Sequence, residues 1–410
     1  MSKKKEEKFS ITVKSSTKDL FAFTKLVPER KRRIEKASSE PITSDPMNEL
    51  ARNLHPEKLF LIVSDIKDET KTTKTFKLGP DPDSITKELA YFRAGQYLSL
   101  KVEVNGVRIT RPYSIASSPS DALNGFYEIT VRKVEGGFLS EHIWDNWKVG
   151  TKVISSGPCG SFYYEPLRDK KEIVSIGGGS GITPFRAMAK EIVKGKMDAK
   201  MTLIYGSSDE NDIIFYDEFK DLEKKYPDKI KVVIVLSCEE VTMEGCETGF
   251  ITANIIKKYA DVENSTFFVC GPQIMYNFLD KEMEAFNLPR KRVRKEVYGE
   301  IKDIINYPGF PKEVSKKTFK LKVQIGNLTK LISAKAIEPV LVAIERANLN
   351  PPSECRSGEC GFCRSLLISG KVFVNPESDG RREADKKFNF IHPCSSYPLS
   401  DLEIKVPRYG

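Results

Sequence analysis

Residues 172–193 read EIVSIGGGSGITPFRAMAKEIV. A short apolar segment leads into a glycine-rich turn, and a helical pattern of apolar residues follows Pro184. A strand, a tight turn and a helix in this order are half of a βαβ unit. The alternation continues through strands expected at 201–206, 231–237 and 265–271, each followed by a helical pattern. This pattern predicts an α/β domain built on a parallel sheet.

The turn GGGSGITP at 177–184 has the features of a phosphate-binding site. Glycines let the backbone approach a ligand closely, and the N-terminus of the following helix presents free N–H groups. The spacing is not G-x-G-x-x-G, so the usual dinucleotide-binding motif is absent. The residues alone leave a purely structural turn as an alternative.

Residues 58–165 consist of short alternating segments separated by Gly, Pro, Asn and Asp, which predicts a closed antiparallel barrel or a sandwich. Within this region, RPYS at 111–114 offers an arginine fork for a phosphate, a tyrosine face for a ring and a serine hydroxyl for a ring nitrogen. The stretch VEGGFLS at 134–140 allows backbone N–H groups to approach a pyrophosphate where a helix begins. Taken singly, each motif is also compatible with an ordinary strand end or turn.

Four of the eight cysteines form a pattern near the C-terminus, CRSGECGFC at 355–363 followed by Cys394. The spacing C-x4-C-x2-C with a distant fourth cysteine is that of a [2Fe–2S] cluster, whose two irons need four thiolates. Gly358 and Gly361 permit unusual backbone angles and bring N–H groups toward the sulfides. A zinc site is disfavoured because a second C-x2-C pair is missing, and a disulfide framework because no secretion signal is recognisable.

Together these motifs resemble the ferredoxin–NADP reductase superfamily, with a C-terminal domain similar to plant-type ferredoxins. The resemblance covers roughly residues 58–410 and extends to GPCGSF at 157–162, Cys270-Gly271-Pro272 and Glu296-Val297-Tyr298. Its domain order resembles the single-chain reductases of oxygenase systems and of hybrid-cluster protein. The expected fold is therefore multidomain, with an antiparallel β-barrel flavin domain, an α/β parallel-sheet nicotinamide domain and an α+β (β-grasp) ferredoxin-like domain. The expected boundaries are 1–55 for a basic extension, 56–166 for the flavin domain, 167–300 for the nicotinamide domain, 301–317 for a linker and 318–410 for the ferredoxin-like domain.

The resemblance also implies site residues. Those expected to bind FAD are Arg111, Pro112, Tyr113, Ser114, Val131, Gly136, Gly137, Phe138, Leu139 and Ser140. Those expected to bind the nicotinamide nucleotide are Gly178, Gly179, Thr183, Ser237, Cys270, Gly271, Pro272 and Tyr298. The expected cluster ligands are Cys355, Cys360, Cys363 and Cys394. Three residues are expected to be catalytic: Ser114 beside flavin N5, Cys270 beside the nicotinamide and Tyr298 beside the isoalloxazine. Cys270 and Tyr298 also fit an ordinary core.

The resemblance implies an NAD(P)H:acceptor oxidoreductase that passes electrons from the nicotinamide through FAD to a [2Fe–2S] cluster and then to an unidentified partner protein. A flavin is needed between the nicotinamide and the cluster because a hydride carries two electrons and the cluster takes one. The acidic turns at 207–210 and 236–240 disfavour a 2′-phosphate, so NADH is expected rather than NADPH. The alternative function is a redox-sensing regulatory flavin/iron–sulfur protein, which would not need a nicotinamide site.

Charge and hydropathy argue against a nucleic-acid-binding protein and against a membrane-spanning protein. The net charge is +9, and residues 1–50 and 318–410 each carry +4 of it without the dense basic stripe of a nucleic-acid-binding protein. The basic run at 30–33 is expected to lie on a solvated helix face rather than in a nucleic-acid or lipid patch. No apolar run reaches membrane-spanning length and no signal peptide is evident, so a cytoplasmic monomer is expected.

The sequence says least about the surface that meets the electron acceptor. Arg356, Arg364, Arg381 and Arg382 lie near the cluster loop or in the stretch leading to Cys394. One expectation is that they dock an acidic partner, and the alternative is that they only keep the domain soluble.

Overall fold

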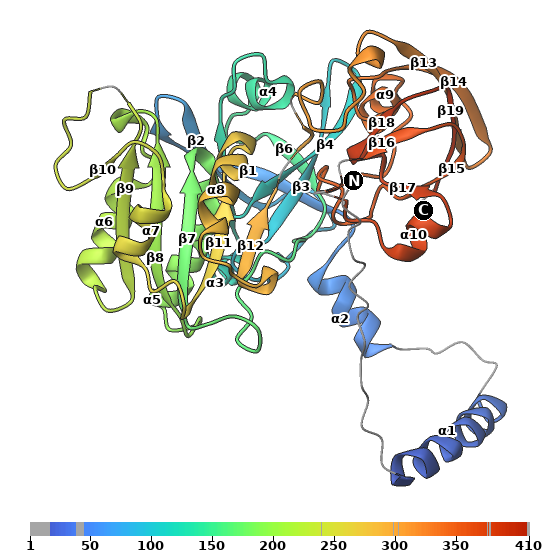
Figure 1. Ribbon diagram of the computed structural model, residues 1–410, viewed down its shortest axis with the longest axis horizontal. Coiled ribbons are helices and arrows are strands. Elements are labelled where there is room, and N and C mark those ends of the chain that lie inside the picture. The colour runs from blue at the N-terminus through green and yellow to red at the C-terminus, as the bar shows by residue number, and fades with distance from the viewer. Residues whose placement is uncertain are drawn as a thin grey trace, which may run out of the picture. The chain divides into compact units, whose positions relative to one another are not determined.

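The computed structural model describes residues 17–37, 45–238, 240–297, 299–301, 303–374, 376 and 379–407 (Figure 1). The chain divides into two units, residues 1–50 and residues 51–410, which are described separately. No helix in the described ranges has both the length and the apolar character that a membrane span requires.

The N-terminal unit contains helix α1, Thr17–Glu35, of which the sequence indicated only the basic face at 30–33. The basic run at 30–33 lies exposed in its last turns, as expected, where positive charge interacts favourably with the helix dipole. Helix α2, Pro46–Leu54, begins after Asp45, whose carboxylate accepts a hydrogen bond from Asn48 N at 3.1 Å. This cap satisfies one of the free N–H groups at the start of the helix.

An antiparallel sheet with strand order β4-β3-β6-β1-β2-β5 follows. Its edge strands meet through a bridge between Ile115 and Ile129, and Ala116 N donates to Glu128 O at 2.7 Å. This closes the predicted barrel around a core that includes Leu61, Phe76 and Tyr127. The elements are β1 (Leu59–Thr70), β2 (Thr73–Pro80), β3 (Tyr97–Val104), β4 (Val107–Ser114), α3 (Pro119–Leu123), β5 (Tyr127–Arg132), α4 (Phe138–Asn146) and β6 (Lys152–Ser155).

The next sheet is parallel, with strand order β10-β9-β8-β7-β11-β12. One core cluster joins its strands to α5 and α6, and a second joins them to α7 and α8, so helices cover both faces, as predicted. The elements are β7 (Glu172–Gly178), η1 (Gly179–Ile182), α5 (Thr183–Val193), β8 (Lys200–Ser207), η2 (Glu210–Asp212), α6 (Tyr216–Lys225), β9 (Ile230–Leu236), β10 (Glu247–Thr248), α7 (Ala253–Tyr259), β11 (Ser265–Cys270), α8 (Gln273–Glu284), η3 (Arg290–Arg292) and β12 (Val293–Glu296).

The C-terminal domain combines a mixed sheet, order β14-β13-β19-β15-β17, with helix α9 packed on it. Parallel pairing of β13 with β19 joins the start of the domain to its end. The elements are η4 (Lys312–Val314), β13 (Thr318–Ile325), β14 (Leu328–Lys335), α9 (Val340–Arg346), β15 (Ser365–Ser369), β16 (Val372–Val374), α10 (Glu383–Lys387), β17 (Phe390–Ile391), η6 (Pro393–Ser395), β18 (Ser396–Pro398) and β19 (Leu402–Val406). The predicted α+β class of this domain is confirmed.

Candidate active site

The glycine-rich turn after β7 and the turn after β11 lie side by side at the carboxyl end of the parallel sheet. Strands β7 and β11 are neighbours, and the order of the strands reverses between them, which is where ligands bind in such sheets. The approach is close, because a Cβ atom on Gly181 would lie 2.1 Å from Cys270 O, and one on Gly178 would lie 2.6 Å from Met275 Sδ. The expected residues Gly178, Gly179, Thr183, Cys270, Gly271 and Pro272 are therefore brought together where the two turns meet, at the expected nicotinamide crevice.

Cys270 forms a buried wall of this crevice. Burial raises the pKa of its thiol well above the usual value, and the Glu296 carboxylate raises it further. The side chain is therefore a neutral thiol near neutral pH, which suits packing against a nicotinamide better than nucleophilic attack. Tyr276 fixes the surroundings, since its hydroxyl accepts from Gly271 N at 3.1 Å and donates to Glu296 O. Tyr298 lies outside the described residues.

Arg132 is a residue that the sequence analysis missed. It lies at the end of β5 in the flavin barrel, but its Nη1 is 2.9 Å from the position a Cβ would take on Gly179, in the nicotinamide domain. Asp212 holds it at 2.5 Å and also accepts hydrogen bonds from Thr72 Oγ1 at 2.9 Å. Arg132 thus places a positive charge at the glycine-rich turn. Its sequence neighbours gave no sign of this, because the contact joins two domains.

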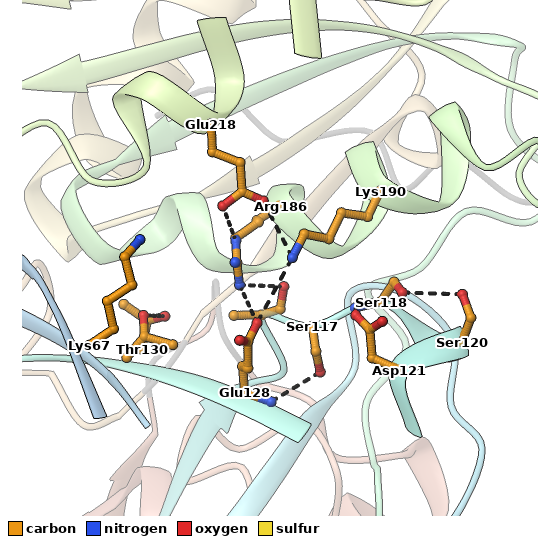
Figure 2. A network of polar contacts seen from close by, with 12 residues as sticks. Lys67, Ser117, Ser118, Ser120, Asp121, Glu128, Thr130, Arg186, Lys190 and Glu218 are labelled. Atoms are coloured by element: carbon orange, nitrogen blue, oxygen red, sulfur yellow. Dashed lines mark hydrogen bonds and ion pairs between the residues drawn. The ribbon is translucent and has the colours of Figure 1, made fainter. Parts of the chain in front are cut away.

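A second set of contacts joins these domains through buried Arg186 of α5, shown in Figure 2. Its guanidinium donates to Glu128 of β5 at 2.6 Å and to Glu218 of α6 at 2.8 Å. Burial opposes the charge on Glu218, but Arg186 and Lys190 outweigh it and hold the pKa of that carboxyl below its ordinary value. These charged contacts fix the nicotinamide crevice relative to the flavin barrel.

The expected flavin residues lie on β4, at the end of β5 and at the start of α4. Ser114 is buried at the end of β4, and Tyr113 packs partly against the barrel core. Helix α4 begins at Phe138, as predicted, and Gly136 before it has a positive φ of 70°. Gly136 N donates to the Glu141 carboxylate at 2.8 Å, so this helix start already receives an anionic oxygen. That chemistry fits a flavin pyrophosphate at the same N–H groups.

Arg111, the expected phosphate anchor, faces two domains. Its Nη1 donates to Thr110 O at 3.0 Å, while Nη2 lies 3.8 Å from Glu300 Oε1 in the segment after β12. Burial and the nearby Arg356 lower the pKa of Arg111, whereas Glu300 raises it. The guanidinium keeps donors for a flavin phosphate, because the 3.8 Å separation from Glu300 is longer than a hydrogen bond.

The four cysteines of the C-terminal motif form one linked set of sulfurs. Cys363 Sγ and Cys394 Sγ are 3.4 Å apart, and Cys360 N donates to Cys355 Sγ at 3.4 Å. Hydrogen bonds from Cys360 and Cys394 lower the pKa of the Cys355 thiol well below its usual value. Within the described ranges no group of three His, Cys, Asp or Glu side chains encloses a single metal ion. A donor set of four clustered thiols with a favoured thiolate instead fits a cluster of two irons.

A cavity of about 740 Å³ lies between the barrel, the nicotinamide domain and the cluster loop. Its lining includes Tyr97, which pairs with Ser114 across the sheet, together with Glu296, Cys355 and Cys360. Residues from the flavin strands, the end of the nicotinamide sheet and the cysteine loop therefore converge on one space large enough for an aromatic ring system.

The turns that were expected to select the donor lie at the carboxyl ends of β8 and β9. Ser237 is exposed there, and its N–H donates to Ser207 O at 3.0 Å. The Glu210 carboxylate accepts hydrogen bonds from Thr242 Oγ1 at 2.6 Å and from Thr242 N at 3.0 Å. These two hydrogen bonds keep the pKa of Glu210 below its usual value. Glu239 lies outside the described residues. The ionised Glu210 beside these turns disfavours a 2′-phosphate.

The expectation of an arginine docking face is wrong for Arg356, which is only 1% exposed and bonded to Glu300 and Glu345. Arg364 pairs with Asp385 and lies over the Phe390 ring at 3.5 Å, and Arg381 pairs with Asp379 at 2.8 Å. Arg364 and Arg381 pair with carboxylates of the same domain, whereas Arg356 also reaches Glu300 outside it; the Arg364 side chain remains 41% exposed and Arg382 is exposed. Sequence proximity to the cluster did not indicate exposure.

Comparisons with known proteins agree with this division. The family model of the oxidoreductase FAD-binding domain matches residues 61–164, that of the oxidoreductase NAD-binding domain matches 176–281, and that of the 2Fe-2S iron-sulfur cluster binding domain matches 326–399. The expected FAD, NAD and [2Fe–2S] domains and their order are therefore confirmed. The boundaries stated above and the individual site residues remain predictions.

Relatives of similar length share this organisation. One component of the 1,2-phenylacetyl-CoA epoxidase of Escherichia coli (strain K12) is 26% identical over 367 residues, covering 85% of this chain and 98% of the relative. The ferredoxin reductase component of 3-ketosteroid-9-alpha-monooxygenase of Mycobacterium tuberculosis (strain CDC 1551 / Oshkosh) is 27% identical over 355 residues, covering 84% and 94%. The solved structure of phthalate dioxygenase reductase shares the fold, with a TM-score of 0.60, 22% identity and coverage of 89% of this chain and 100% of that chain.

Proposed function

We propose that this chain, which belongs to the oxidoreductases that join an FAD-binding, an NAD-binding and a 2Fe-2S domain, is the NADH-dependent reductase component of an oxygenase system. Its electron acceptor would be an oxygenase or a ferredoxin-type carrier. The named relatives from Escherichia coli and Mycobacterium tuberculosis, one a component of an epoxidase and the other a component of a monooxygenase, support this choice.

Each site would contribute binding and orientation. The bound flavin supplies the chemistry that accepts a hydride and releases electrons one at a time. Arg111 and the start of α4 would hold its phosphates, and Tyr113 and Ser114 would orient its ring. The turns at Gly178 and Gly271 would press the nicotinamide toward that ring. Because Cys270 stays a neutral thiol, it would shape the crevice without taking a proton.

The cysteine loop would hold the cluster through Cys355, Cys360, Cys363 and Cys394. The observation that carries the proposed function is the contact between the C-terminal domain and β4. This strand carries Arg111 and is called the flavin strand below. Helix α9 packs against β4, and Arg356, next to Cys355, shares Glu300 with Arg111. The flavin site and the cluster site are thus neighbours, as an electron path requires.

An anaerobic titration tests the proposal. Stoichiometric NADH should bleach the flavin absorbance and then produce the EPR signal of a reduced cluster, and an oxygenase-type partner should reoxidise both. The redox-sensor alternative predicts that NADH leaves the flavin oxidised, and that result would contradict the proposed function.

Donor choice needs a separate measurement. The ionised Glu210 beside the adenosine side of the crevice favours NADH over NADPH. The ratio of kcat/KM for the two donors should favour NADH, and a ratio that favours NADPH would contradict this assignment.

A further inference from the structure

Glu300 lies where three domains meet. It follows the last strand of the nicotinamide sheet, and its carboxylate lies against Arg356 of the cluster loop and near Arg111 of the flavin strand. Arg356 and Arg111 together lower the pKa of Glu300 although burial opposes this, so the group is ionised near neutral pH. One carboxylate therefore carries contacts to the flavin strand and to the cysteine loop.

Arg356 is held unusually firmly for a residue beside a predicted cluster ligand. Its backbone φ is +59°, a conformation that side chains with a Cβ rarely adopt. The side chain is fully buried, with Nε donating to Glu300 at 2.9 Å and Nη1 donating to Glu345 at 2.5 Å. A buried guanidinium requires such partners, so the strained loop conformation depends on the two carboxylates.

The two carboxylates have different origins. Glu345 belongs to α9 within the cluster domain, so its bond to Arg356 stays within that domain. Glu300 comes from outside and also pairs with Arg111 at 3.8 Å. The bond between Glu300 and Arg356 therefore links the cysteine loop to Arg111 of β4, in addition to the packing of α9 on that strand.

We propose that Glu300 is a positioning residue that fixes the cluster loop against the flavin strand and thereby sets the rate of electron transfer from flavin to cluster. Its ion-pair partners, Arg356 and Arg111, lie outside the two turns at Gly178 and Gly271, so the hydride-transfer step should not depend on its charge. This inference rests on the proposed function for the identity of the two steps, hydride transfer to the flavin and electron transfer to the cluster. The geometry of the loop is a property of the chain itself.

The test compares Glu300→Gln with the matched control Glu338→Gln. Glu338 also pairs with an arginine, Arg346, but both residues belong to the C-terminal domain and the arginine is exposed. A hydrogen bond to a charged group contributes about 1.5–3 kcal/mol, so loss of the Glu300 charge should lower the ratio of docked to undocked loop roughly ten- to a hundredfold.

Three measurements follow from this. In stopped-flow traces under argon, Glu300→Gln should bleach its flavin with NADH at the wild-type rate but reduce its cluster more slowly. With dithionite as reductant, the EPR line shape of its cluster should change, because the loop carrying Cys355 relaxes. Tryptic cleavage around Lys312–Lys317 should accelerate. Glu338→Gln should match the wild type throughout, and Glu300→Asp should restore part of each property.

Unchanged cluster reduction, EPR line shape and proteolysis in Glu300→Gln would overturn the proposal. Loss of flavin with an unchanged cluster signal would also overturn it, since Glu300 would then serve Arg111 alone. If Glu300→Gln does not fold, Arg356→Lys keeps the charge but loses the paired donors and should separate the two electron-transfer steps in the same way. A wild-type flavin that NADH does not reduce would refute the proposed function, whereas the dithionite and proteolysis comparisons would still decide the role of Glu300.

Discussion

Substitution of Gly181 by alanine tests the nicotinamide crevice most directly. The added Cβ would lie 2.1 Å from Cys270 O, 2.5 Å from Cys270 C and 2.7 Å from Gly271 Cα. Ordinary contacts begin at about 3.4 Å, so the two turns must separate by about 1.3 Å, and both partners are backbone. A displacement of about 1 Å can cost roughly a hundredfold in rate when it separates reacting groups. Hydride transfer from NADH to flavin should fall by about that factor.

The assay is anaerobic stopped-flow reduction of the flavin by NADH, with the flavin and iron content measured on the same sample. Both contents should equal the wild-type values, because the atoms nearest to the added Cβ belong to Cys270 and Gly271 and not to β4 or the cysteine loop. Gly206→Ala is the matched control, since its Cβ would meet the flexible end of Ile251 at 3.3 Å and the backbone Gly177 O at 3.8 Å, which is an ordinary contact. Wild-type reduction rates in Gly181→Ala would refute the placement of the nicotinamide between these two turns.

Three further variants test other parts of the site. Cys360→Ser should abolish the EPR signal of the reduced cluster and leave flavin bound, and an unaltered signal would remove Cys360 from the ligand set. Arg111→Ala should weaken FAD binding roughly ten- to a hundredfold, measured by flavin release, because a charge-assisted bond is lost. Arg186→Met breaks a buried charge network and should cost about 3–5 kcal/mol of unfolding free energy at pH 7. Because the pKa of Glu218 is lowered in the folded state, its contribution is present above about pH 4.5 and is lost on acidification. The difference in Tm between wild type and Arg186→Met should therefore shrink below that pH, and a constant difference would contradict the role of the pair.

Local sequence was sufficient wherever a motif combines a strand, a turn and a helix start. The turn GGGSGITP and the start of α4 at Phe138 were located correctly. Glycines in a turn and a helix that follows them are local properties of the chain. The full extent of helix α1 was missed because Pro28 lies inside it and nine of its 19 residues are charged, so its apolar periodicity is weak. Arg356 was expected among the exposed arginines near the cluster but is buried, because sequence proximity carries no information about burial.

The sequence by itself determined the kinds of domain and their order, since periodicity, glycine spacing and cysteine spacing are written along the chain. It did not determine that Arg132 reaches Gly179 or that Glu300 joins Arg111 to Arg356. Those contacts join residues from different domains, and their partners are carboxylates and backbone groups that carry no motif. Only the packing of the barrel, the parallel sheet and the cysteine loop brings them together, because a buried charge is stable only where packing supplies its opposite.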